Sequence, residues 1–200
     1  MKLIFATTNI HKVEEIRYLL GDSFEILTPS ALGFEGEMPE TADTLHDNAL
    51  QKARFVWNKF HLPCFADDTG LEVIALGGAP GVYSARYAGE GKSTEDNVQL
   101  LLKNMLNEGN RKAQFRCVIA LIINEQEYCF EGKVEGEVLT EKQGEKGFGY
   151  DPVFRPKGYA YSFAEMPHED KNRISHRGKA VAQLTDFLKK GNTTGLNCKI

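Results

Sequence analysis

The fold class follows from residues 113–134, which read AQFRCVIALIINEQEYCFEGKV. The centre of the first run is apolar on both faces of an extended chain, which is typical of a strand in the middle of a sheet. The polar residues 124–127 then turn the chain into a second strand-like run at 128–134, so the two runs predict a hairpin. A hairpin excludes a purely parallel, doubly wound sheet.

Strand and helix patterns alternate on both sides of this hairpin. A strand-like run at 3–6 precedes a helical pattern that begins after Asn9 and ends at Gly21, and a second strand-like run follows at 24–27. Further helices are expected at about 43–60, from Ser93 onward and at about 175–190. A strand-like segment at 63–73 is interrupted by DDTG, and a short strand is expected after the turn at 147–152. We therefore expect an α/β fold with a mixed β-sheet and flanking helices, in one domain over residues 1–190 followed by a polar tail at 191–200.

Composition and charge argue against nucleic acid and membranes as binding partners. The 200 residues are 42% hydrophobic and 26% charged, as in an ordinary globular protein. The formal net charge of -4 provides no general basic field for nucleic acid or an anionic membrane, and no apolar run approaches the ~20 residues that span a bilayer. Four cysteines without a C-x-x-C pair favour a reducing cytoplasm. An anionic small molecule would need a few cations gathered in one place.

Two motifs lie where helices are expected to begin. TTNIHK at 7–12 follows the first strand, and a helix N-terminus there offers N–H groups and a positive dipole end to phosphate, with Lys12 as an added charge. KNRISHRG at 171–178 is expected to open the last helix, where basic side chains oppose the dipole and so indicate a bound anion. The alternatives are an ordinary capped turn and a solvated basic face.

The pair Asp67-Asp68 lies between apolar residues, so both carboxylates are expected to be buried and to need a partner or a metal. Adjacent side chains of a strand point to opposite faces, so one aspartate can face a site while the other anchors the chain. Glu40 precedes the second helix and Lys52 lies on it; carboxylate oxygens suit Mg²⁺. The alternatives are an Asp-rich turn and a solvated helix face.

GFGYDP at 147–152 places two aromatic side chains beside glycines, which could stack on a base. Pro152 favours an extended Asp151, and the alternative is a tight turn with core aromatics. Taken together, the motifs supply what a polyphosphate bound through Mg²⁺ and attacked by water requires. The candidate cations are Lys12, Lys52, Lys171 and Arg177, and the candidate metal ligands are Asp68 and Glu40.

Five motifs in this order resemble the inosine/xanthosine triphosphate pyrophosphatase family over about residues 1–190. They are Thr7-Thr8-Asn9-x-x-Lys12, Asp67-Asp68-Thr69-Gly70-Leu71, Gly77-Gly78-x-Pro80-Gly81-x-Tyr83-Ser84-Ala85-Arg86-Tyr87, Gly147-Phe148-Gly149-Tyr150-Asp151-Pro152 and Ser175-His176-Arg177-Gly178. Thr8 departs from the family's frequent glycine, and Thr69 from its common serine. The resemblance implies a mixed sheet forming two lobes around a deep substrate cleft, usually in a homodimer.

The resemblance also implies Mg²⁺-dependent hydrolysis of ITP, dITP and XTP to monophosphate and pyrophosphate. Asp68 would accept a proton and hold Mg²⁺ with Glu40. Thr7, Thr8, Asn9 and Lys12 would hold the triphosphate, and Ile10, His11, Lys52 and Thr69 would also contact the substrate. The residues that would line the base pocket or read the purine edge are Phe148, Gly149, Tyr150, Asp151, Lys171, His176 and Arg177. The alternatives are a Maf-like pyrophosphatase for modified pyrimidine nucleotides, a nucleotide sensor without catalysis and a nucleic-acid-binding module.

Overall fold

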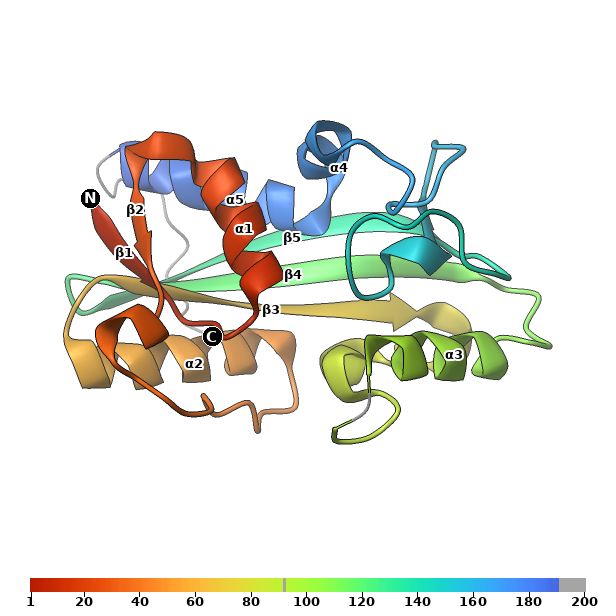
Figure 1. Ribbon diagram of the computed structural model, residues 1–200, viewed down its shortest axis with the longest axis horizontal. Helices are drawn as coiled ribbons and strands as arrows, with labels where there is room; N and C mark the ends of the chain where they lie inside the picture. The colour runs from red at the N-terminus through yellow and green to blue at the C-terminus, as the bar shows by residue number, and fades with distance from the viewer. Residues whose placement is uncertain (92, 191–200) are drawn as a thin grey trace. The chain divides into compact units, whose positions relative to one another are not determined.

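A computed structural model describes residues 1–91 and 93–190, and the expected polar tail at 191–200 lies outside them. Within the described residues, six strands form one sheet in the order β2-β1-β3-β4-β5-β6 (Figure 1). β1 pairs in parallel with β2 and β3, whereas β5 and β6 pair antiparallel, which confirms the predicted mixed α/β fold. Over these same residues, no helix has the length and apolar character that crossing a bilayer requires.

The chain divides into two compact units. Unit 1 comprises residues 1–68, 117–132 and, in the described chain, 177–190; unit 2 comprises residues 69–116 and 133–176. The elements of unit 1, some continuing into unit 2, are β1 (Lys2–Phe5), α1 (Ile10–Leu20), β2 (Glu25–Leu27), α2 (Leu45–Phe60), β3 (Cys64–Val73), β4 (Lys112–Ile123), β5 (Gln126–Val138) and α5 (His176–Lys189).

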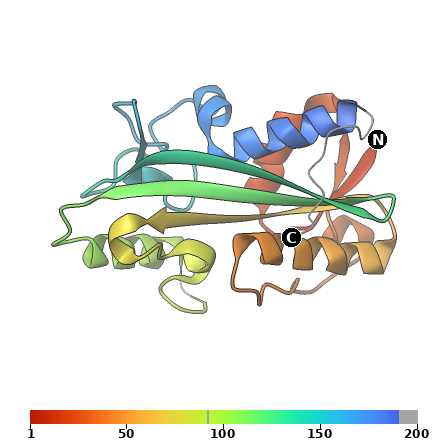
Figure 2. The ribbon, with the colours of Figure 1, turned by 180° about the vertical axis from the view of Figure 1, so that it is seen from behind.

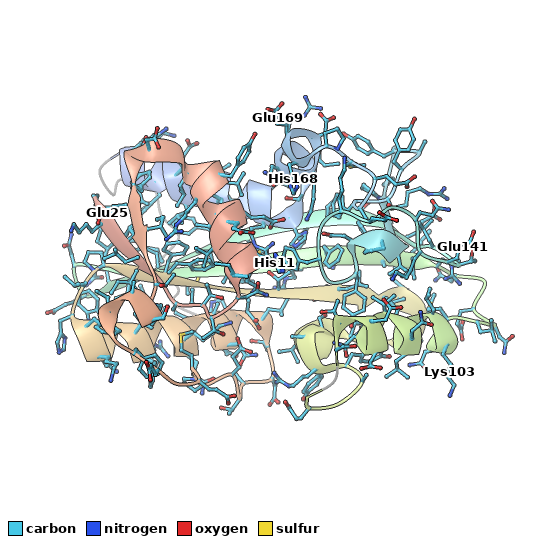
Figure 3. The ribbon with its side chains drawn as sticks, in the orientation of Figure 1. His11, Glu25, Lys103, Glu141, His168 and Glu169 are labelled. Atoms are coloured by element: carbon cyan, nitrogen blue, oxygen red, sulfur yellow. The ribbon has the colours of Figure 1, made fainter. Side chains whose placement is uncertain are left out.

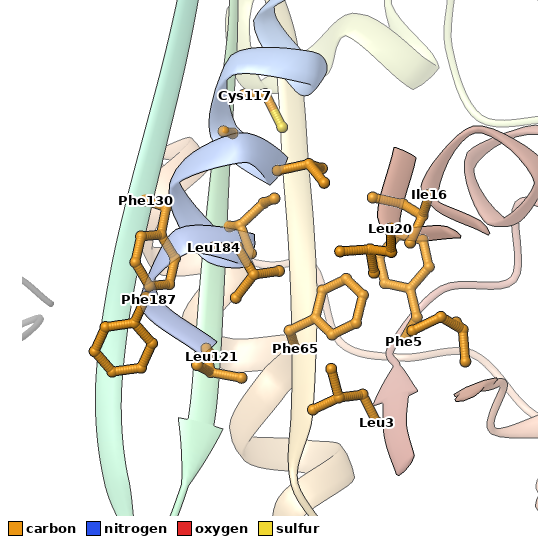
Figure 4. Packing of buried hydrophobic residues seen from close by; sticks show 14 of the residues in the cluster. Leu3, Phe5, Ile16, Leu20, Phe65, Cys117, Leu121, Phe130, Leu184 and Phe187 are labelled. Atoms are coloured by element: carbon orange, nitrogen blue, oxygen red, sulfur yellow. The ribbon is translucent and has the colours of Figure 1, made fainter. Parts of the chain in front are cut away.

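Unit 1 has three layers. Helices α1 and α5 cover one face of its strands and α2 covers the other, as both views show (Figures 1 and 2). Figure 4 shows the core under α1 and α5, with Phe5 and Phe65 labelled. Their rings stack with centroids 4.7 Å apart. Ile16 of α1 and Leu184 of α5 are fully buried in the same cluster. Each such side chain contributes about 1.5–3 kcal/mol through burial, so the helices are fixed by the apolar stripes that the sequence predicts.

Unit 2 adds α3 (Thr94–Asn104), β6 (Phe154–Pro156) and α4 (His168–Ile174). Helix α3 begins after Ser93 as the sequence predicts, and a capping box between Ser93 and Asp96 fixes its first turn. In Figure 1, α3 and α4 lie on opposite sides of the strands of this unit. Its core includes Leu101 of α3 together with Phe115 and Phe154, whose rings meet edge to face at 4.8 Å.

Two strands differ from their predicted extents. β3 is continuous through DDTG rather than interrupted there, because the two carboxylates find cationic partners on opposite faces and need no turn. The hairpin turn is confined to Asn124 and Glu125, which have φ values of 51° and 62°, so β5 begins earlier and runs further than expected. Positive φ at both central residues is typical of the tight two-residue hairpin turn.

Helix α4 was not predicted, and its presence corrects the interpretation of the KNRISHRG motif. Lys171 and Arg173 lie in the last turn of α4 rather than at the start of α5, so they complement a helix dipole instead of opposing it. With seven residues and Pro167 directly before it, α4 is too short to show a helical period. Of the four candidate cations, Arg177 alone lies in the first turn of α5.

Candidate active site

The two adjacent aspartates of β3 face opposite layers of unit 1. Asp67 accepts hydrogen bonds from Lys12 of α1 and Arg177 of α5, whereas Asp68 accepts them from Asn48 and Lys52 of α2. This arrangement confirms the prediction that the two carboxylates point to opposite faces of a strand. The pair therefore ties β3 to helices on both sides.

Asp67 is fully buried and is held by two cations. Its Oδ1 lies 2.9 Å from Lys12 Nζ, and its Oδ2 lies 3.2 Å from both Nε and Nη2 of Arg177. Burial acts to raise the pKa of Asp67, but the charges of Lys12 and Arg177 outweigh it and hold the pKa well below its usual range. Arg177 also donates from Nη1 to Glu15 Oε2 at 2.5 Å. Asp67 is therefore an ionised anchor.

Asp68 has a different electrostatic setting. Its Oδ2 accepts from Asn48 Nδ2 at 3.2 Å and its Oδ1 lies 3.3 Å from Lys52 Nζ. Burial raises the pKa of Asp68 above its ordinary value; Lys52 opposes the shift, while the negative charges of Glu40 and Asp67 add to it. A carboxylate with a raised pKa is a better proton acceptor near neutral pH than an ordinary aspartate. Asp68 therefore has the properties of a general base.

Lys52 lies between several acceptors. It is 3% exposed, and its Nζ donates to Glu40 Oε1 at 2.5 Å, to the carbonyl oxygen of Asp67 at 2.8 Å and to Asp68 at 3.3 Å. Burial acts to lower the pKa of Lys52, but Asp68 and Glu40 outweigh it and raise the pKa, so the ammonium stays charged. In turn, burial acts to raise the pKa of Glu40, and Lys52 outweighs that effect and lowers it.

The first turn of α1 is capped as the sequence predicts. Asn9 Oδ1 accepts from the backbone N–H groups of His11 and Lys12 at 3.0 and 3.3 Å, and Thr7 Oγ1 accepts from the N–H of Asn9 at 3.2 Å. Lys12 points inward to Asp67, whereas His11, which is labelled in Figure 3, is exposed and lies 3.7 Å from Glu14. The remaining members of the segment are exposed: Thr8, Asn9 and Ile10.

The GFGYDP segment lies in unit 2 around a buried ion pair. Asp151 Oδ2 accepts from Lys171 Nζ at 2.8 Å and from the N–H of Phe148 at 2.9 Å. Gly147 has a φ of 76°, and a Cβ on it would lie 2.2 Å from the same carboxylate, so the turn requires glycine there. Lys171 Nζ lies 5.2 Å from the centroid of the Phe148 ring, which places a cation beside an aromatic face.

Tyr150 and His176 pack into unit 2. Tyr150 is 4% exposed, belongs to the hydrophobic core, and donates from its hydroxyl to the carbonyl oxygen of Ser84 at 2.9 Å. The His176 ring stacks on Phe115 with centroids 4.6 Å apart and planes 13° from parallel. Ser84 Oγ also accepts from the N–H of Leu71 at 2.9 Å, so the loop at 81–86 is fastened to the end of β3.

The predicted cations divide between the two units. Lys12, Lys52 and Arg177 gather around Asp67 and Asp68 in unit 1. Lys171 belongs to unit 2 and pairs with Asp151, and Thr69 and Gly149 also belong to unit 2. The sequence assigned no role of their own to three residues that the structure pairs with predicted ones: Glu15 with Arg177, Asn48 with Asp68 and Ser84 with Tyr150. A signal for Asn48 existed, because it falls with Lys52 inside the buried stripe of α2.

The carboxylate oxygens of Asp68 and Glu40 suit a metal ion whose other ligands come from phosphate and water. Among the described residues, no group of three His, Cys, Asp or Glu side chains could hold a metal ion. Mg²⁺ is commonly held by one or two carboxylates, with phosphate oxygens and water completing its shell. Two carboxylates that share Lys52 therefore suit Mg²⁺ delivered with a polyphosphate better than a metal bound by protein alone.

Comparison with known sequences points to one family. The sequence model of the Ham1 family matches residues 3–187. A dITP/XTP pyrophosphatase of Porphyromonas gingivalis is 57% identical over 188 residues, which cover 94% of this chain and 97% of that protein. A dITP/XTP pyrophosphatase of Flavobacterium johnsoniae is 51% identical over 188 residues, covering 94% and 98% of the two chains.

Solved structures agree with these matches. The Staphylococcus aureus Ham1 protein superposes with a TM-score of 0.86 at 37% identity, covering 95% of this chain and 99% of that one. A HAM1 protein from Coxiella burnetii superposes with a TM-score of 0.88 at 36% identity, covering 96% and 100%. The similarity therefore extends over nearly the whole length of both folds.

Proposed function

Because the chain belongs to the Ham1 family, we propose that it hydrolyses non-standard purine nucleoside triphosphates (ITP, dITP and XTP) to a monophosphate and pyrophosphate. Relatives named dITP/XTP pyrophosphatase at 57% and 51% identity over nearly the whole chain support this reaction. The observation that carries the proposal is the buried Asp68 carboxylate, with its raised pKa, hydrogen-bonded beside Lys52. A base of this kind is what the attack of water on a phosphoanhydride requires.

In the proposed reaction, Asp68 accepts the proton of a water molecule that attacks the α-phosphorus. The bond between the α-phosphorus and the bridging oxygen breaks, and pyrophosphate leaves. Asn48 keeps the Asp68 carboxylate oriented through its hydrogen bond at 3.2 Å. Lys12 and Lys52 supply positive charge to the triphosphate, and the capped first turn of α1 supplies N–H groups. Thr7, Thr8, Asn9, Ile10, His11 and Thr69 are proposed to line the phosphates.

Asp68 and Glu40 are the residues that we propose to hold Mg²⁺. When bound, Mg²⁺ neutralises phosphate charge and orients the attacking water. The separate role of Asp67 is to keep Lys12 and Arg177 in place on the other face of β3. The two aspartates thus divide catalysis and anchoring between them.

Selectivity is assigned to donors that face the 6-oxo group of the purine. Lys171 is such a donor, held by Asp151 above the Phe148 ring. A 6-amino purine would present its own donors to this group, and an unpaired buried donor costs about 1–3 kcal/mol. The other residues proposed for the base are Gly149, Tyr150, His176 and Arg177.

We further propose that the protein acts in the cytoplasm as a homodimer that binds neither nucleic acid nor membrane. The net charge of -4 supports the absence of a nucleic-acid partner. The dimer is tested by light scattering during size-exclusion chromatography, where a mass near twice 22.4 kDa is expected. A mass near that of one chain contradicts it.

A panel of nucleoside triphosphates with Mg²⁺ tests the proposed reaction. The panel comprises ITP, dITP, XTP, dATP, dGTP and a modified pyrimidine triphosphate, and both pyrophosphate and orthophosphate are quantified. We expect pyrophosphate from the first three, and loss of about 10²-fold or more in the Asp68→Asn variant, since a general base contributes that much. Orthophosphate as the product overturns the proposal, binding without hydrolysis favours a sensor, and a preference for the pyrimidine favours a Maf-like enzyme.

A further inference from the structure

We propose that the Lys52 ammonium occupies the cation position between Glu40 and Asp68 in the nucleotide-free protein, so that metal and nucleotide must enter together. The inference rests on the proposed function and deepens it by assigning an order to binding. Lys52 contacts both carboxylates that are proposed as metal ligands, at 2.5 Å from Glu40 and 3.3 Å from Asp68. A lysine in this position satisfies the carboxylates that a metal would otherwise bind.

The Lys52 side chain is held in place by burial and by a further hydrogen bond. Its side chain is 4% exposed, and its Nζ has a further acceptor, the carbonyl oxygen of Asp67, at 2.8 Å. The residue lies on the buried stripe of α2, one turn after Asn48, which holds the other oxygen of Asp68. Local geometry therefore directs the ammonium to the carboxylates in the absence of a ligand.

Electrostatics then disfavours metal binding to the free protein. A divalent cation that approached Glu40 and Asp68 would meet a unit positive charge within a few ångströms, and such a repulsion is large where water is partly excluded. The described residues provide no group of three acidic, histidine or cysteine ligands that could compensate for it.

A triphosphate removes this obstacle. Its oxygens are strong acceptors for a lysine ammonium, so Lys52 can leave the carboxylates and bind phosphate. The same phosphate supplies oxygens for Mg²⁺, and Glu40 and Asp68 become available to the metal. Because coupling between two ligands is reciprocal, each should strengthen the binding of the other. Lys52 thereby prevents the free protein from retaining metal without substrate.

The test measures Mn²⁺ binding to the full chain without nucleotide, by the electron paramagnetic resonance signal of unbound Mn²⁺. We expect Lys52→Met to bind Mn²⁺ at least about tenfold more tightly than the unchanged protein, because one nearby positive charge is removed. Lys52→Arg keeps the charge and should not gain affinity. Lys59→Met removes a charge from the exposed end of the same helix and should also leave the affinity unchanged.

A second measurement covers the case in which Lys52→Met folds poorly. Lys52→Gln keeps a donor for the carbonyl oxygen of Asp67, and Mn²⁺ should raise its melting temperature more than that of the unchanged protein. Equal Mn²⁺ affinity in the unchanged protein and in Lys52→Met and Lys52→Gln overturns the inference. Tight Mn²⁺ binding by the unchanged protein at a stoichiometry of one, abolished by Glu40→Gln, overturns it as well.

The failure of this inference and that of the proposed function are distinguishable. Pyrophosphate release from dITP by the unchanged protein with Mg²⁺ is measured alongside the Mn²⁺ titration. If pyrophosphate is released but Lys52→Met gains no metal affinity, the order of binding is wrong and the function stands. If no pyrophosphate is released, the function itself fails, whatever the titration shows.

Discussion

Asp67 shows how a single buried carboxylate organises its surroundings. It holds a lysine from α1 and an arginine from α5, two residues that are 165 positions apart in the chain. A buried charge of this kind is tolerated because it is paired, and removal of one partner leaves the others uncompensated. The anchor therefore affects stability and the position of Lys12 at once.

The first prediction concerns the pH dependence that Asp67 produces. Its pKa is lower in the folded protein than in the unfolded chain, so it stabilises the fold above its unfolded pKa of about 4 and this stabilisation is lost as the pH falls below that value. Asp67→Asn should reduce the free energy of unfolding by about 3–5 kcal/mol at pH 7 and by less at pH 3.5. Urea unfolding at both pH values measures this, with the exposed Asp22→Asn as the control. An equal difference at the two pH values contradicts the account.

The second prediction concerns Lys171 and the choice of base. If its ammonium donates to the 6-oxo group, Lys171→Met should reduce the ratio of kcat/KM for dITP over dATP by about 10- to 100-fold, the worth of one charged hydrogen bond. Steady-state kinetics with both nucleotides measure the ratio, and a general loss of stability would lower both values without changing it. Lys103→Met, at the exposed end of α3 (Figure 3), serves as the control. An unchanged ratio would remove Lys171 from the base site.

At the scale of elements, the end of β3 and the loop at 81–86 are held together by backbone contacts and by the Ser84 side chain. The N–H of Leu71 donates to Ser84 Oγ, and Ser84 Oγ donates to the carbonyl oxygen of Gly81 at 2.6 Å. Gly70 lies against the same carbonyl, so the backbones approach as closely as a missing side chain permits. These contacts explain why glycine is needed at position 70 and serine at position 84.

The third prediction tests this close approach. A Cβ on Gly70 would lie 2.4 Å from the carbonyl oxygen of Gly81, which is backbone and has little freedom to move. Gly70→Ala should therefore reduce the free energy of unfolding by about 1–3 kcal/mol, as overpacked positions do. Gly109 has open space around its Cβ position and no positive φ, so Gly109→Ala should change it by less than about 0.5 kcal/mol. Similar effects of the two substitutions in urea unfolding would be inconsistent with the contact.

The elements that the sequence predicted share a regular period or a cap. The stripe of α1, the cap at Asn9 and the hairpin of β4 and β5 are confirmed because each is a local pattern. Helix α4 is short and lacks a period, and the continuity of β3 through DDTG depends on cations that approach from α1, α2 and α5. A local sequence pattern therefore predicts neither α4 nor the continuity of β3.

At the scale of the whole molecule, the charges explain how an acidic chain can present cations to an anion. Lys12, Lys52 and Arg177 are gathered in unit 1, and each is held by carboxylates. The sequence indicated candidate cations and candidate metal ligands by residue type, but their pairing required the fold. Lys171 pairs with Asp151 in unit 2, and its part in binding the same anion stays a prediction.

The most direct test of the central claim is the position of bond cleavage. Hydrolysis of dITP with Mg²⁺ in ¹⁸O-labelled water, followed by mass spectrometry of both products, reports which phosphorus the water attacks. If Asp68 activates water toward the α-phosphorus, the label should appear in dIMP, and the pyrophosphate should be unlabelled. Label in pyrophosphate, or labelled orthophosphate as the product, would contradict the account.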